Sequence, residues 1–92
     1  QYNELYQFGG KVVNYDGEKA IIDIRNRLQV GDTMEILVPH QLEPVVFTID
    51  KLWDVDTNEE IEAVSPGVKD QKVKMMLPIK CEKDWILRRK KC

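Results

Sequence analysis

The chain has 92 residues, with 14 Lys and Arg against 16 Asp and Glu, so its formal net charge is −2 at pH 7. This length fits one domain, and a near-neutral charge excludes a protein whose whole surface binds nucleic acid. Hydrophobic residues make up 42% and charged residues 33%, which is a globular rather than a disordered composition.

The first predicted elements are two strands over residues 6–15 and 18–25. Ten Val and eight Ile against two Ala favour strands, because β-branched side chains fit a pleated sheet. Ala20, Ile22 and Ile24 alternate with Lys19, Ile21, Asp23 and Arg25, which is the period of a strand with one buried face. Asp16-Gly17 between the two runs is a strong signal for a hairpin turn.

Four further strands are predicted over residues 33–38, 45–50, 60–64 and 72–77. Gly31-Asp32, Pro39, Pro44 and Pro78 separate these runs with turn signals. Residues 84–89 are expected to form either a seventh short strand or a single helical turn. About six short strands with tight turns predict an all-β fold, and closing them into a small antiparallel β-barrel removes exposed edges. We therefore expect one domain over residues 1–92.

The chain lacks the residue patterns of a catalytic or metal site. It has two cysteines, Cys81 and Cys92, and one histidine, His40. We expect both cysteines to be free thiols in a cytoplasmic protein. A disulfide between Cys81 and Cys92 is the alternative. Residues 54–58 resemble the start of a calcium loop, but Glu59 stands where that loop needs Gly, so a polar hairpin turn is expected instead. We predict no catalytic residue, no metal site and no cofactor.

The charges divide unevenly along the chain. Residues 1–68 hold five basic and thirteen acidic residues, whereas residues 69–92 hold nine basic and three acidic residues. A basic stripe can bind phosphates, pair with acidic residues of the same domain, or dock on another domain. Arg25 and Arg27 add two cations at a corner where Asn26 and Asp32 are expected to bond to the backbone. The candidate binding residues are thus Lys72, Lys74, Arg88, Arg89, Lys90, Arg25 and Arg27.

Several stretches together resemble a known family. They are residues 8–16, 22–28, 30–35, 49–53, 62–67 and 85–89, and the most specific is Arg-Asn-x-Leu-x-x-Gly-Asp-x-Met-Glu over residues 25–35. Almost the whole chain resembles the C-terminal domain of the U32 peptidases, the collagenase-like peptidases. The resemblance implies a compact barrel similar to the second domain of translation elongation factors. It also implies a larger catalytic domain, which carries the active site and a cysteine cluster.

These observations lead to two functional hypotheses. The first is a non-catalytic accessory domain, excised from a U32-family peptidase, that docks on the catalytic domain as a lid or as a substrate-positioning surface. The alternative is an RNA-binding module that assists a relative which hydroxylates transfer or ribosomal RNA. The expected partners are the catalytic domain of the parent protein and either a protein substrate or structured RNA. No apolar run is long enough to span a membrane, and the start at Gln1 lacks a signal peptide, so a cytoplasmic location is expected.

Overall fold

Strands and turns make up the part of the chain that the structure describes. The structure is a computed structural model, and it describes residues 6–67 and 71–90. The strands in these residues are β1 (Tyr6–Asp16), β2 (Lys19–Ile24), β3 (Leu28–Gln29), β4 (Thr33–Leu37), β5 (Val45–Thr48), β6 (Leu52–Asp54), β7 (Glu60–Ile61), β8 (Ala63–Val64), β9 (Gln71–Met75) and β10 (Ile86–Lys90).

The hairpin of β1 and β2 forms the middle of the sheet, as the sequence predicts. Gly17 turns the chain with a φ of 65°, a conformation that glycine adopts without steric cost. β1 pairs with β2 along one side and with β10 along the other. At Gly10 the strands approach so closely that a Cβ atom would lie 2.5 Å from the carbonyl oxygen of Asp23. The register of β1 shifts once against each neighbour, and such bulges bend a strand.

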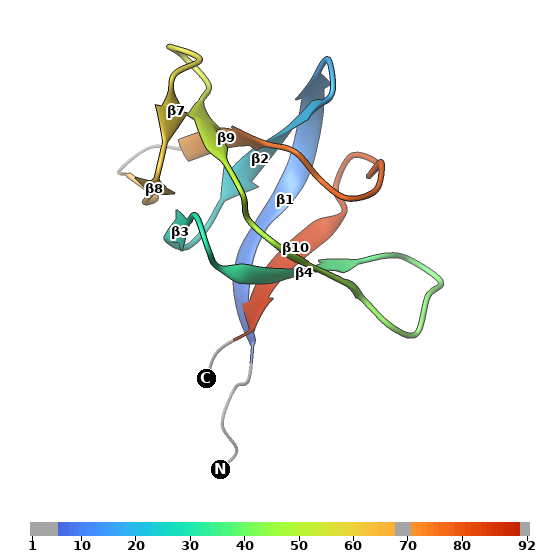
Figure 1. Cartoon of the computed structure of the whole chain (residues 1–92). Coiled ribbons are helices and arrows are strands. Elements are labelled where there is room, and N and C mark those ends of the chain that lie inside the picture. The colour runs from blue at the N-terminus through green and yellow to red at the C-terminus, as the bar shows by residue number, and fades with distance from the viewer. Residues whose placement is uncertain (1–5, 68–70, 91–92) are drawn as a thin grey trace.

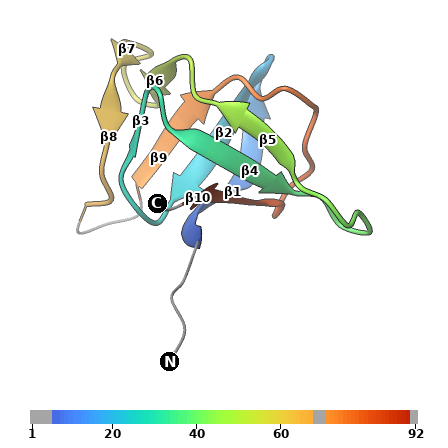
Figure 2. The ribbon, with the colours of Figure 1, turned by 60° about the horizontal axis from the view of Figure 1, so that its bottom comes forward.

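The main sheet is a curled half-barrel and not the closed barrel of about six strands that we expected. It has eight antiparallel strands in the order β5-β4-β10-β1-β2-β9-β6-β7, and β3 pairs with β8 in a second, two-stranded sheet. The curvature is visible in Figures 1 and 2. Residues 84–89 give a strand, β10, rather than a helical turn, and the predicted strand 60–64 is divided into β7 and β8.

The short strand β3 and the turn that follows it lie between the two edges of the half-barrel. The edge strands β5 and β7 do not pair with each other. Instead, the backbone amide of Val30 donates at 2.8 Å to the carbonyl of Glu62, the residue that follows β7. On the other side, the amide of Gly31 donates to the carbonyl of Ile49 at 2.9 Å, just after β5. β3 and its turn thus connect the two edges, in place of a direct ladder between β5 and β7.

The inner face of the curled sheet holds the hydrophobic core. The buried apolar residues are Val12, Ala20, Ile22, Ile24, Leu28, Met34, Ile36, Ile49, Leu52, Val73, Met75, Cys81 and Leu87. The buried charged residues Asp23, Glu35 and Lys74 alternate with core positions on β2, β4 and β9 and therefore lie on the outer face. Each of the three is ion-paired, which is what a buried charge requires.

Candidate functional site

The two candidate lysines of β9 share one face of the strand but differ in exposure. Lys72 is exposed, whereas Lys74 is only 4% exposed. The Lys74 ammonium donates to the Asp16 carboxylate at 2.5 Å and to the Asn58 side chain at 2.6 Å. The hydrogen bond from Lys74, and then its charge, lower the pKa of the Asp16 carboxyl below its ordinary value of 3.8. Lys74 therefore ties β9 to the two neighbouring turns.

The two candidate arginines of β10 are also held by side chains of this domain. Arg88 donates through Nε to a carboxylate oxygen of Glu35 on β4 at 2.8 Å. Arg89 lies 3.3 Å from the Asp32 carboxylate and donates to the side chain of Gln7 at 2.6 Å. Lys90 ends β10, and its side chain lies outside the part that the structure describes. Arg88 thus joins β10 to β4, and Arg89 joins β10 to β1 and to the turn before β4.

The corner before β3 carries the two remaining candidates, and both are exposed. Arg25, just after β2, lies 3.3 Å from the carboxylate of Asp23 on that strand, and Arg27 donates to the Gln29 side chain at 3.4 Å. Between them, Asn26 donates to the backbone carbonyl of Phe8 at 2.6 Å. Asn26 therefore bonds to the backbone, but to that of β1 rather than within its own turn.

Taken together, the candidate cations are mostly engaged within the domain. Four of them, Lys74, Arg88, Arg89 and Arg25, form ion pairs with acidic side chains of the same chain. The structure brings Arg27 and Arg89 together beside the Asp32 turn. Lys72 on β9 instead lies opposite Asp23, the ion-pair partner of Arg25. Assignment of the seven residues to one binding surface stays a prediction.

The most specific sequence stretch, residues 25–35, has a structural reason for its residue types. Asn26 joins the corner to β1, and Leu28 lies in the core. The Asp32 carboxylate accepts the amide of Gln29 at 3.1 Å in addition to Arg89. Met34 is buried, and Glu35 holds Arg88. This stretch therefore organises the fold, leaving Arg25 and Arg27 at its exposed start.

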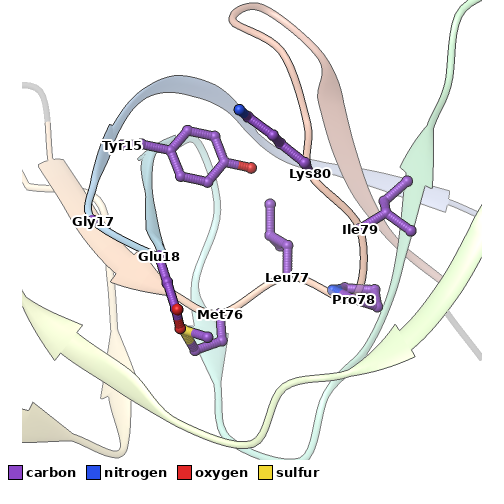
Figure 3. A pocket seen from close by; sticks show the side chains of 8 residues that line it. All are labelled: Tyr15, Gly17, Glu18, Met76, Leu77, Pro78, Ile79 and Lys80. Carbon is purple, nitrogen blue, oxygen red and sulfur yellow. The ribbon is translucent and has the colours of Figure 1, made fainter.

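A hollow that the sequence did not predict lies beside the β1–β2 turn. It measures about 470 Å³ and is lined by Tyr15, Gly17, Glu18, Met76, Leu77, Pro78, Ile79 and Lys80. Met76 and Ile79 are exposed, and Leu77 points toward the Tyr15 ring in Figure 3. The amide of Cys81 donates to the Tyr15 hydroxyl at 2.7 Å, which holds the 76–80 segment against the hairpin. A mainly apolar hollow with a few polar groups is suited to apolar ligands or side chains.

A second hollow lies on the other side of the same segment. It measures about 340 Å³, and Phe47 and Trp53 line it together with Met76, Leu77 and Pro78. Trp53 is partly buried, and the Lys19 ammonium lies 4.1 Å from the centre of its ring, so this tryptophan has a cation–π partner. The 76–78 segment is therefore an apolar ridge with a hollow on each side. The only sequence signal for it is the apolar run Met76-Leu77-Pro78-Ile79 directly after a strand.

A metal ion would need a cluster of suitable side chains among the described residues. Among residues 6–67 and 71–90, no group of three or more His, Cys, Asp or Glu side chains could hold a metal ion. Residues 54–58 form a turn in which the Asp54 carboxylate accepts the amides of Asp56 and Thr57, as expected for a polar turn. Burial raises the pKa of the Cys81 thiol, which opposes a role as a nucleophile. Cys92 lies outside these residues.

Comparison with known proteins identifies the class of domain. Residues 4–88 match the peptidase family U32 C-terminal domain, and the chain therefore belongs to this family. Two crystal structures of the C-terminal domain of a Geobacillus thermoleovorans protein assigned to the U32 peptidases are similar, each 28% identical in sequence. One has a TM-score of 0.76 over 91% of this chain and 92% of its own. The selenomethionine variant has a TM-score of 0.74 over 89% and 98%. No protein of curated function matches the chain.

The family confirms the resemblance that the sequence indicated, and it makes this chain part of a larger U32 peptidase. Likeness to the second domain of elongation factors stays a prediction, as does a cytoplasmic location. The described part of the chain contains no helix that is long and apolar enough to cross a membrane.

Proposed function

We propose that this chain is a non-catalytic accessory domain that docks on the catalytic domain of a U32 peptidase and there acts as a lid or positions the substrate. The proposal rests on a contrast between the charged and the apolar side chains of the surface. Four of the candidate cations are ion-paired within the domain, whereas large apolar side chains such as Val46, Met76 and Ile79 are exposed. Exposed apolar groups are typical of surfaces that contact other proteins.

The hollow beside Tyr15 suits the substrate-positioning role. Its apolar wall of Met76, Leu77 and Pro78 would receive an apolar side chain of a polypeptide. Glu18 and Lys80 also line it and would offer a carboxylate and an ammonium to the polar backbone on either side of that side chain. The methionine side chain adapts to different shapes, which suits a site that meets many sequences.

Incubation of the purified domain with a fluorescent unfolded protein tests the non-catalytic part of this proposal. The relative from Geobacillus thermoleovorans crystallised as its C-terminal domain alone, so such a domain folds without the rest of its chain. We expect no cleavage by the 92 residues. Cleavage that a single substitution within the domain abolishes would overturn the proposal.

RNA binding is the second candidate, because Lys72, Arg25 and Arg27 remain exposed. A titration with transfer RNA at low and at moderate salt distinguishes the two functions. Under the accessory proposal, RNA does not bind at low salt. Binding that falls steeply with salt and weakens in Lys72→Glu would support RNA recognition instead, because phosphate contacts release counterions.

A further inference from the structure

A row of side chains crosses the outer face of four neighbouring strands. The register aligns Val46 of β5 with Glu35 of β4, Glu35 with Arg88 of β10, and Arg88 with Phe8 of β1. Directly opposed residues in antiparallel strands lie side by side. The two outer members of the row are apolar and exposed, Val46 by 59% and Phe8 by 42%. The two inner members are the ion pair of Glu35 and Arg88.

A second row extends this surface by one step along the strands. Leu37 of β4 lies opposite Ile86 of β10, and Ile86 lies opposite Lys11 of β1. Ile86 is 38% exposed and Leu37 is partly buried. We call Phe8, Leu37, Val46 and Ile86, with the Glu35–Arg88 pair among them, the outer patch.

The charges inside the outer patch already neutralise each other. Glu35 is only 7% exposed although it lies on the outer face, and its partner Arg88 is 2.8 Å away. A protein that covers the patch therefore needs no charged group of its own to compensate Glu35. Interface cores are apolar and contain few unpaired charges. The chemistry of the patch thus fits an apolar protein surface rather than an anionic one.

The outer patch lies at the end of the domain where the chain enters. Tyr6 at the start of β1 pairs with Lys90 at the end of β10, and both strand ends lie together in Figure 1. Phe8 is two residues further along β1, roughly 7 Å from that end. The hollow beside Tyr15 lies at the other end of β1, near the β1–β2 turn. In a C-terminal domain, the preceding domain is attached at the Tyr6 end.

We propose that the outer patch is the surface on which the preceding domain of the same polypeptide packs. This inference rests on the proposed accessory function and assigns the docking surface for it. Covalent attachment through the chain that leads to Tyr6 keeps the preceding domain at a high effective concentration near the patch. Packing there leaves the hollow free at the opposite end to meet a substrate.

Hydroxyl-radical footprinting of the full-length parent protein and of the isolated domain tests the inference. We expect oxidation of Phe8 and Ile86 to fall several-fold in the parent. Oxidation of Met76 and Ile79, which are exposed away from the patch, stays unchanged. Protection of Met76 and Ile79 with none at Phe8 would show that docking occurs through the hollow and would overturn this inference alone. Equal oxidation of all four in both samples would overturn docking itself.

Matched substitutions give an independent test with the isolated domain and the remainder of the parent. Val46→Asp places a charge in the patch, and Leu42→Asp places the same charge at a fully exposed loop position outside it. We expect Val46→Asp to weaken association about tenfold or more, because charges are excluded from interface cores. Leu42→Asp should leave the affinity unchanged. Equal affinities for the two variants would refute the assignment of the patch, provided that both keep the unfolding midpoint of the unsubstituted domain.

Discussion

The Glu35–Arg88 pair gives a sharp prediction for stability. Arg88→Met leaves the Glu35 carboxylate, which is 7% exposed, without its partner at 2.8 Å. Breaking a fully buried pair costs about 3–5 kcal/mol, and the Arg88 side chain is still 27% exposed, so we expect a loss of about 2–3 kcal/mol. For a domain of this size that loss lowers the thermal midpoint by about 10–20 °C.

A complete double-mutant cycle isolates the interaction energy between Glu35 and Arg88 from their contacts with other residues. Glu35→Met should cost less than Arg88→Met, because the Arg88 side chain is 27% exposed and reaches water, whereas the Glu35 side chain is only 9% exposed. The double variant should lie within about 1 kcal/mol of the unsubstituted domain, since two apolar groups replace a buried pair well. Urea unfolding followed by tryptophan fluorescence measures all four proteins. Single substitutions that each cost less than about 0.5 kcal/mol and simply add would refute the reasoning.

Three further predictions concern the rest of the fold. Lys74→Glu should lower the urea midpoint strongly, because it places a second carboxylate beside Asp16 in a buried site, whereas Lys72→Glu should leave it nearly unchanged; equal midpoints would contradict this. Gly10→Ala should destabilise by about 1–3 kcal/mol in thermal unfolding through backbone overlap, whereas Gly17→Asn, with open space around it, should cost less. The pKa of the Asp16 carboxyl is lowered in the folded state, so its contribution to stability is present at neutral pH and is lost as the pH falls below 3.8. Asp16→Asn should therefore flatten the loss of stability measured in acid, and an unchanged acid profile would refute the pairing.

The longer strands could be predicted from the sequence because each carries enough residues to show alternation. β1, β2, β4 and β9 were expected nearly where they lie. β3 and β6 were missed, since two or three residues are too short to display a period of two. The opening of the barrel could not be predicted either. At the open side, β3 and its turn bond through Val30 and Gly31 to segments far along the chain, and such pairings leave no local pattern in the sequence.

The candidate site could be predicted from the sequence only where it depends on neighbouring residues of one strand. Alternation correctly placed Lys72 and Lys74 on one face of a strand. It could not reveal that Lys74 is covered, because its partners Asp16 and Asn58 come from two distant turns. The hollow was missed for the same reason, as it joins the β1–β2 hairpin to the 76–80 segment. Membership of the family, in contrast, could be predicted because it depends on residue order alone.

The most direct test of the account is a calorimetric titration of this domain with the rest of its parent protein. The account predicts saturable association with a negative heat-capacity change, the mark of apolar burial. Association should also persist in moderate salt, because the outer patch is apolar and its ion pair is satisfied. A Kd of about 100 μM corresponds to a binding free energy of about 5.5 kcal/mol. No detectable association at concentrations of about 100 μM would contradict the claim that this is a docking domain.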